Sequence, residues 1–268
     1  MASKKLQLLM LGCLVSPAIL QAQSLKKEYI QWHNNESDKL ARSVEAWKNN
    51  GKVTEDDNFF ISRVKPKQRF RNQNTQVLKN LDDTNDKRLV AWVPFNNPET
   101  NALPDGIFDS EVFSLWSYVS HWGDWTAPLG RVPAALMDVA HKNGVAVSSV
   151  AGVPFGALSP EYASMFAGLK GQDMPKKAAS YLAYYGIDGL GYNSEFTSSP
   201  GDVANIRNFH VALNKEMKSK NPIFENVWYD GTTDNGNRWF DQGLDNHNKK
   251  NFGKAGEEAA SLFFNYNW

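Results

Sequence analysis

From Leu89 onward, short apolar runs alternate with amphipathic segments, and this alternation limits the possible folds more than any other feature of the sequence. The apolar runs predict strands at 89–93, 112–121, 145–150, 187–196, 223–229 and 262–268. The segments between several of them predict helices at 133–143, 174–185, 203–219 and 256–260. Strands that alternate with helices along the chain form parallel sheets. The sequence therefore predicts an α/β fold.

The number of predicted strands decides which parallel architecture fits the chain. A TIM-type barrel needs eight strands, and the sequence ends inside the sixth predicted strand. We interpret the chain as a (β/α)8 TIM-type barrel truncated after about six strands, with an N-terminal helical and irregular extension. The alternative is an open doubly wound sheet. In both architectures, the ligand site lies at the C-terminal ends of the strands.

The N-terminus has the features of a secretory signal. Lys4 and Lys5 precede a largely apolar run that is interrupted by Pro17 and is too short for an integral membrane span. We therefore expect a signal peptide at 1–22, an N-terminal extension at 23–87 and a partial barrel at 88–268. The expected location is secreted, periplasmic or at the cell surface. Cys13, in a run that resembles a lipoprotein box, leaves a lipid anchor as the alternative.

The composition narrows the classes of partner. The formal net charge is zero and no basic stripe is present, so nucleic acid is not an expected partner. Cys13 is the only cysteine and the five histidines are scattered, so we expect neither a metal site nor a cofactor. The sequence also lacks glycine-rich nucleotide motifs and a Gly-x-Ser-x-Gly nucleophile elbow. Its nine tryptophans suit either a sugar-binding cleft or a protein core.

The fourth predicted strand ends in polar residues. Asn193 and Glu195 are two positions apart, so on a strand their side chains point to the same face. Inward-facing residues at the C-terminal ends of barrel strands are typical catalytic positions. The sequence therefore predicts that an amide and a carboxylic acid project together into one site.

This pair of groups favours one class of chemistry. Glycoside hydrolysis usually uses two carboxylates, of which one is the acid and the other is the nucleophile or base. An amide is a poor nucleophile, so a site with Asn193 and Glu195 needs another one. In substrate-assisted hydrolysis, the 2-acetamido oxygen of the sugar attacks the anomeric carbon. Glu195 can then serve as the acid, and Asn193 can orient the acetamide.

The segment Asp188-Gly189-x-Gly191-x-Asn193-x-Glu195 resembles the fourth-strand motif of the endo-β-N-acetylglucosaminidases of glycoside hydrolase family 85. It is also similar to the Asp-Gly-x-Asp-x-Asp-x-Glu motif of family 18 chitinases, and the asparagine favours family 85. The resemblance implies that Glu195 is the acid/base and that Asn193 orients the acetamide. An ordinary half-exposed strand end is the alternative for this segment.

The similarity to family 85 extends from about Leu89 to Trp268. The segment Asn226-Val227-Trp228-Tyr229-Asp230 resembles the fifth-strand motif of the family, which implies that Tyr229 contacts the acetamide and the intermediate. By the same resemblance, six further residues are expected to bind substrate: His121, Trp122, Trp228, Trp239, Asn265 and Trp268. Packing in the core or at the barrel rim is the alternative role for the tryptophans.

Other polar residues are expected to have lesser roles. His141 lies near a predicted helix C-terminus, where we expect it to be structural. Asp230 points away from Tyr229 on a regular strand, so it is a weaker catalytic candidate. Asp245, Asn246 and Asn248 resemble an asparagine-bearing run of the family, but the spacing does not show which of them matches.

The resemblance implies a retaining endo-β-N-acetylglucosaminidase that cleaves the GlcNAc-β1,4-GlcNAc core of N-glycans, with an N-linked glycan or glycoprotein as its substrate. Two alternatives remain at this point: a family 18-like chitinase, and a barrel that binds glycans without catalysis or is an inactive fragment. The sequence does not reveal which glycan branches are accepted.

Overall fold

The computed structural model describes residues 44, 60–67, 89–92, 114–124, 132–152, 156–157, 173–240 and 243–263. The predicted signal peptide at 1–22 and the predicted substrate-binding residues Asn265 and Trp268 lie outside the described residues. None of the helices in the described ranges is long and apolar enough to cross a membrane.

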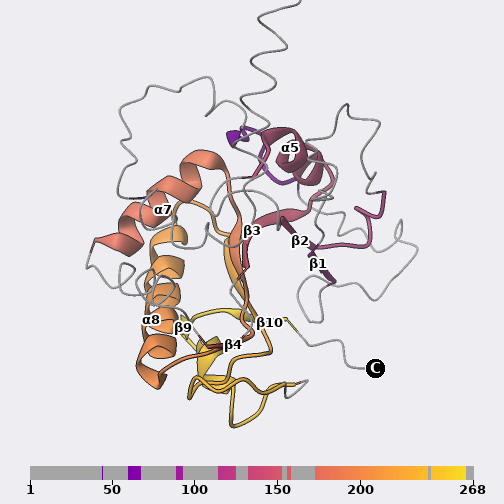
Figure 1. The fold of residues 1–268 in the computed structure, drawn as a ribbon. Helices are drawn as coiled ribbons and strands as arrows, with labels where there is room; N and C mark the ends of the chain where they lie inside the picture. The colour runs from indigo at the N-terminus through magenta and orange to yellow at the C-terminus, as the bar shows by residue number, and fades with distance from the viewer. Residues whose placement is uncertain are drawn as a thin grey trace, which may run out of the picture.

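The centre of the structure is a parallel sheet whose strands are arranged in chain order (Figure 1). Its strands are β1 (Val90–Trp92), β2 (His121–Asp124), β3 (Ala146–Gly152), β5 (Gly189–Asn193), β7 (Glu225–Tyr229) and β10 (Ser261–Phe263). A doubly wound sheet reverses its strand order at a switch point, whereas a barrel adds each new strand beside the previous one. The curled sheet therefore confirms the predicted TIM-type barrel with six strands in its described part.

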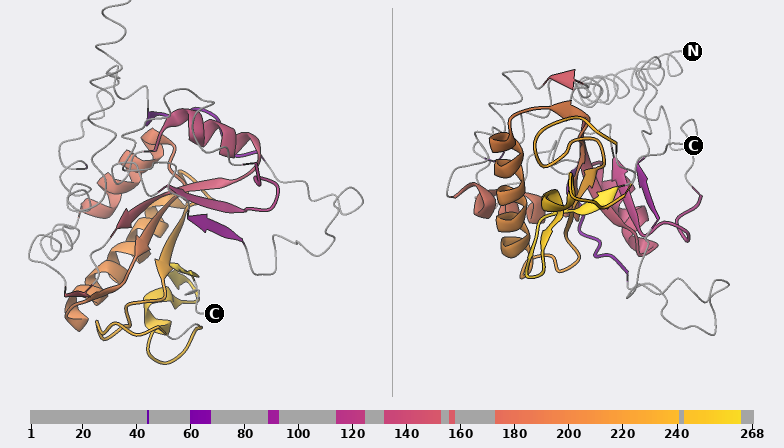
Figure 2. Two further views of the ribbon diagram at one scale, coloured as in Figure 1. Left: turned by 45° about the vertical axis from the view of Figure 1, so that its right-hand side comes forward. Right: turned by 90° about the horizontal axis from the view of Figure 1, so that it is seen from below.

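In the part of the chain that the structure describes, helices cover the outer face of this sheet (Figure 2). They are α5 (Ala134–Lys142), α7 (Met174–Tyr185) and α8 (Pro200–Met217). Leu182 of α7 and Leu213 of α8 are fully buried in the same cluster as Leu190 of β5. The main apolar core thus lies between the helices and the sheet, as expected for a βα barrel.

Local sequence signals account for the ends of these helices. The predicted helix at 174–185 matches α7, which ends at Gly186 with a left-handed φ of 82° that glycine adopts without strain. Helix α8 begins at Pro200, three residues before the predicted start. The Ser199 side chain accepts a hydrogen bond from the backbone of Asp202, and proline is favoured at the first helical position.

The second predicted strand, at 112–121, is wrong. Residues 116–118 form a turn, and β2 begins only at His121. The Trp116 ring packs edge-on against the Trp122 ring, with 5.7 Å between centroids. The apolar residues that predicted a strand here are side chains of a turn that pack on the core. Side chains in a turn can show the same apolar spacing as a strand, so the pattern alone did not distinguish the two.

The predicted helix at 256–260 is also wrong. Its first three residues belong to a small antiparallel hairpin of β8 (Gly253–Lys254) and β9 (Glu257–Glu258), which follows the short 3-10 helix η1 (Lys249–Phe252). Gly256 lies in the turn with φ of 82°, a conformation that ends any helix at this point. The connection between β7 and β10 is therefore built from turns and this hairpin.

The two faces of the sheet carry different residues, with glycines on the inner face of β2 and β5 and large aromatic side chains on the outer face of β5 and β7. Gly123 and Gly191 face the barrel interior, where a Cβ atom at either position would collide with the Trp92 ring. Tyr192 and Trp228 are paired on neighbouring strands and face outward, under helix α8. The missing side chains at the two glycines thus leave room for the Trp92 ring inside the barrel.

The segment 60–67 packs against the N-terminal end of the sheet. Phe60 is buried in the main core. His141, at the end of α5, contacts Asp188 through Nε2 at 2.7 Å and the carbonyl of Val64 through Nδ1 at 2.6 Å. Asp188 also accepts a hydrogen bond from the backbone of Val147. His141 is therefore structural, as predicted, and it lies at the opposite end of the strands from Asn193.

Candidate active site

Asn193 and Glu195 lie side by side at the C-terminal end of β5. The Asn193 Nδ2 atom donates a 2.9 Å hydrogen bond to Oε2 of Glu195. Both residues are partly exposed, whereas most of β5 before them is buried. An amide and a carboxylate therefore face solvent together at the barrel end where catalytic residues of this fold are found.

Tyr229 is the last residue of the neighbouring strand β7. It follows Trp228, which pairs with Tyr192, so Tyr229 and Asn193 are at the same level and on the same face of adjacent strands. The Tyr229 ring is buried between Phe240 and Phe263, at centroid distances of 6.2 and 5.8 Å. The structure thus brings Tyr229 to the same end of the barrel as Asn193.

The loops that carry these residues are in direct contact. The Ser194 hydroxyl donates a 2.5 Å hydrogen bond to the carbonyl of Tyr229. A Cβ atom at Gly231 would overlap the Ser194 carbonyl and would lie 3.2 Å from Cγ of Glu195. The close approach of the two loops therefore requires glycine at position 231.

Trp122 and Trp228, both predicted to contact sugar, do not line this site. Trp122 and Trp228 are buried and belong to the core on the outer face of the sheet. The Trp228 ring lies near Tyr192 and His210, and its Nε1 donates a hydrogen bond to the carbonyl of Thr232. Since neighbouring residues on a strand face opposite ways, Tyr229 and Trp228 cannot both point into the barrel.

Trp239 remains a candidate for sugar contact. Its side chain is 61% exposed, and it lies on the loop that follows β7. Its backbone N–H donates a hydrogen bond to the carbonyl of Gly231, next to the segment that carries Glu195. A large exposed aromatic ring on this loop is available to pack against a sugar.

His121 belongs to a polar layer inside the barrel rather than to the exposed site. Its Nε2 contacts the hydroxyl of Ser148, and its Nδ1 lies 4.0 Å from Oε2 of Glu225, whose other oxygen accepts a hydrogen bond from Ser261. Glu225 is the first residue of β7, four positions before Tyr229. Sequence reasoning singled out His121 but not the contacts of this layer, because its members come from four strands that are far apart in the chain.

The loop after β7 is supported by a buried asparagine. Asn248 donates hydrogen bonds to Oδ1 of Asp230 at 3.0 Å and to the carbonyl of Gly243 at 2.6 Å. Asp230 is itself buried, on the other side of the strand end from Tyr229. Among the three candidates for the asparagine-bearing run, Asn248 is thus the one that is buried beside the strand end, whereas Asn246 is exposed.

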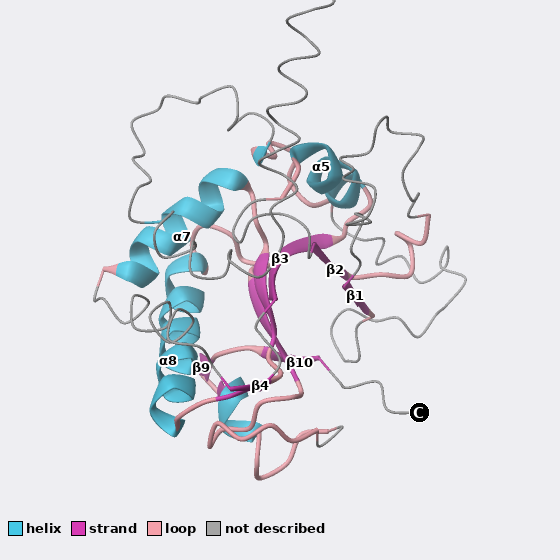
Figure 3. Cartoon of the chain, viewed as in Figure 1, coloured by secondary structure: helices cyan, strands magenta, loops and turns pink. Residues whose placement is uncertain are grey.

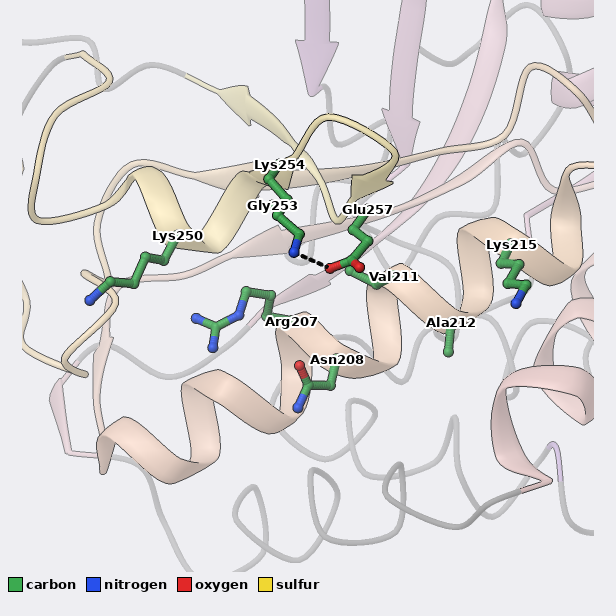
Figure 4. Close-up of a pocket in the computed structure, with 9 residues that line it drawn as sticks. All are labelled: Arg207, Asn208, Val211, Ala212, Lys215, Lys250, Gly253, Lys254 and Glu257. Atoms are coloured by element: carbon green, nitrogen blue, oxygen red, sulfur yellow. Dashed lines mark ion pairs between the residues drawn. The ribbon is translucent and has the colours of Figure 1, made fainter.

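A basic groove of about 550 Å³ lies elsewhere, between α8 and the η1–β9 segment (Figure 4). Its lining includes four basic side chains, which are Arg207, Lys215, Lys250 and Lys254. Lys254 pairs with Glu257 at 3.2 Å and Lys250 with Asp234 at 3.0 Å, so half of this positive charge is neutralised. The groove contains none of the predicted site residues.

The segment after Glu195 also pairs with a short strand that follows β3. Strand β6 (Phe196–Thr197) directly follows Glu195 and pairs in parallel with β4 (Gly156–Ala157), which is labelled in Figure 3. The segment with Glu195 is therefore bordered by the loops that follow β3 and β7.

A solved structure agrees with this architecture. The glycoside hydrolase domain of Endo-D from Streptococcus pneumoniae R6 superposes with a TM-score of 0.63 and 21% identity, over 85% of this chain and 36% of that structure. The present chain thus spans about a third of that structure. A chitinase from Bacteroides thetaiotaomicron has a TM-score of 0.36 and 14% identity, over 54% of this chain and 47% of its own. No curated protein matches the sequence.

The match to a family sequence model is stronger evidence than the structural superposition. The sequence model of Glycosyl hydrolase family 85 matches residues 96–268, which is more than half of the chain. The matched range includes Asn193, Glu195 and Tyr229. The motif at the end of β5, the barrel-like sheet and this match agree, and the chain belongs to glycosyl hydrolase family 85.

Proposed function

We propose that this protein hydrolyses the bond between the two GlcNAc residues of the N-glycan core, with the acetamido group of the substrate as the nucleophile. The observation that supports this proposal most directly is the 2.9 Å hydrogen bond between Asn193 and Glu195 at the end of β5. A carboxylate whose neighbour is an amide is the arrangement that substrate-assisted hydrolysis needs. The family match makes glycoside hydrolysis the expected reaction class.

In the first proposed step, Glu195 donates a proton to the glycosidic oxygen while the acetamido oxygen bonds to the anomeric carbon. The glycosidic bond breaks, the second GlcNAc leaves with the protein attached, and an oxazolinium ring forms. The side-chain carbonyl of Asn193 can accept a hydrogen bond from the acetamide N–H. The hydroxyl of Tyr229 can hydrogen-bond to the acetamido group and to the intermediate, which keeps the nucleophile oriented for attack.

In the second proposed step, water attacks the anomeric carbon from the face that the leaving group has vacated. Glu195, now a carboxylate, accepts a proton from this water, and the acetamide re-forms. Two inversions at the same carbon give net retention of configuration. No protein nucleophile is required, so the amide at position 193 is compatible with the complete cycle.

The decisive experiment compares the full-length wild type with Glu195→Gln on a labelled N-glycoprotein. We expect the wild type to leave single GlcNAc stubs on the protein, and the variant to lose activity by at least about 100-fold, since general acids contribute roughly 10²–10⁴-fold. Glu257→Gln, at an exposed glutamate in the basic groove, is the matched control. Wild-type activity in Glu195→Gln would refute the assignment, and glycan binding without stubs would identify a non-catalytic binder.

We also propose that the protein acts outside the cytoplasm, on the basis of the Lys4-Lys5 and apolar pattern at 1–22. Mass spectrometry of the protein from the culture medium and from the membrane fraction would locate it. An unprocessed N-terminus in the cytoplasm would contradict this proposal.

A further inference from the structure

Thr232 makes unusual contacts with the loop that carries Glu195. It lies three residues after the end of β7 and is buried. Its hydroxyl oxygen lies 2.8 Å from the carbonyls of both Ser194 and Phe196, and it accepts a hydrogen bond of 3.2 Å from the backbone N–H of Phe196. One side chain thus bonds to the main chain on both sides of Glu195.

The backbone of Thr232 is fixed by hydrogen bonds from two buried side chains. Its carbonyl accepts hydrogen bonds from Nε1 of Trp228 at 3.3 Å and from Nδ2 of Asn251 at 2.9 Å. Trp228 is part of the buried core, and Asn251 is buried in η1. The backbone of Thr232 is therefore fixed by buried groups, and this fixes the position of its hydroxyl. The hydrogen bond to Thr232 also gives Trp228 a structural role without any contact to sugar.

The main chain at Glu195 depends on such contacts because it is not part of a regular ladder. Strand β5 ends at Asn193, and β6 begins only at Phe196. The backbone N–H of Glu195 makes a local 3.0 Å bond to the carbonyl of Asn193. The position of the Glu195 carboxylate is thus set by how residues 194 and 196 are held.

We propose that Thr232 is a positioning residue for Glu195, and that its hydroxyl keeps the acid within reach of the glycosidic oxygen. This inference rests on the proposed function of Glu195. Proton transfer needs the acid within hydrogen-bond distance of the leaving oxygen, and a displacement of about 1 Å can cost on the order of 100-fold in rate. Loss of the Thr232 hydroxyl should therefore lower kcat much more than it raises KM.

Thr233 provides a matched control in the same turn. It is also buried, and its hydroxyl bonds to the carbonyl of Asn237 at 3.1 Å and accepts from the backbone of Asn237 at 3.2 Å. These bonds close the turn of Thr233 itself rather than the loop that carries Glu195. Thr232→Val and Thr233→Val thus remove the same kind of contact at adjacent positions.

The experiment measures kcat and KM of full-length Thr232→Val, Thr232→Ser and Thr233→Val on two substrates. One is the natural core glycan, and the other carries 4-nitrophenol in place of the leaving GlcNAc. Because 4-nitrophenolate leaves without protonation, a misplaced acid should slow the first step only for the glycan. Glu195 is also the base of the second step, which both substrates share, so the comparison uses kcat/KM, which reports only the steps up to release of the leaving group. For Thr232→Val we expect kcat/KM to fall about 10- to 100-fold on the glycan and less than about 3-fold on the aryl substrate.

The serine variant retains the hydroxyl, so we expect it to stay within about 3-fold of the wild type on both substrates. Three outcomes would overturn the positioning role but leave the proposed function standing: equal losses on both substrates, no loss in Thr232→Val, or the same loss in Thr233→Val. A wild type that cleaves neither substrate would overturn the proposed function and this inference with it. If Thr232→Val does not fold, Thr232→Ala gives the same comparison.

Discussion

Asp188 and His141 are joined by a buried 2.7 Å contact between Oδ2 and Nε2, although 47 positions separate them in the chain. Both ring nitrogens of His141 face acceptors, since Nδ1 lies 2.6 Å from the carbonyl of Val64. Asp188 is bonded in addition to Asn221 and to the backbone of Val147. This network joins α5, β5 and the 60–67 segment at the end of the barrel away from Glu195.

The first prediction concerns stability as pH rises. Burial lowers the pKa of His141, but the hydrogen bond and negative charge of Asp188 outweigh it, and the net pKa lies above 6.5. Protonation of His141 therefore favours the folded state. The stability that it contributes is complete below pH 6.5 and is lost as pH rises through the raised pKa. We expect urea midpoints to fall across that window in the wild type and to vary less in His141→Gln.

The same variant should be destabilised by roughly 3 kcal/mol at pH 6, because removing one partner leaves the Asp188 carboxylate buried without it. Thermal and urea unfolding at fixed pH would measure this loss. An unchanged midpoint at pH 6 would show that the contact contributes little to folding.

The second prediction concerns stability in acid. His210 is buried against Tyr192 and Trp228, and among the described residues its Nε2 has no hydrogen-bond partner. Burial lowers the pKa of His210 to about 3. The unfolded chain therefore binds a proton that the folded chain does not, and stability falls as pH drops from 6.5 towards 3. In His210→Phe we expect a smaller loss across this range, measured by the same urea midpoints.

The third prediction concerns Asn193. We expect Asn193→Ala to lose most hydrolysis of the core glycan, because the acetamide is no longer oriented for attack. Supplying a preformed sugar oxazoline bypasses that step, so partial turnover should return. Mass spectrometry of the products would follow both reactions. Equal inactivity on the glycan and on the oxazoline would argue against the orienting role.

The fourth prediction concerns the contact between the two site loops. A methyl group at Gly231 would overlap the Ser194 carbonyl and would lie 3.0 Å from the Phe240 ring. We expect Gly231→Ala to cost about 1–3 kcal/mol of unfolding free energy and to reduce activity. Gly201→Ala is the control, because its new methyl group would lie 3.5 Å from its nearest neighbour, the Ser199 hydroxyl. Full activity in Gly231→Ala would show that the loops can separate without consequence.

Several features could be predicted from local patterns. The helix at 174–185 has an apolar face and a glycine stop, and both signals act within a few residues. Asn193 and Glu195 lie side by side as the two-residue period predicted, although β5 ends at Asn193 and a local bond from the Glu195 N–H to the Asn193 carbonyl shapes the chain there. The order of strands and helices then led to the barrel, because parallel neighbours require crossover connections.

Other features could not be predicted because they depend on distant residues. Val227, Trp228 and Tyr229 are three consecutive apolar residues, so periodicity does not show which of the two rings faces the helices. The spacing of aromatics near Trp116 indicated a strand, but a core can receive the same side chains from a turn. The Thr232 contacts with Ser194 and Phe196 join segments more than 30 residues apart.

The sequence by itself determined the parallel barrel class, the family motif and the acid–amide pair, because each depends on the order and spacing of nearby residues. The tertiary structure alone decided which aromatic rings are buried, which histidine contacts Asp188 and how Thr232 holds the loop of Glu195. The reason is physical: backbone periodicity acts over a few residues, whereas burial and hydrogen-bond partners exist only once separate strands lie side by side.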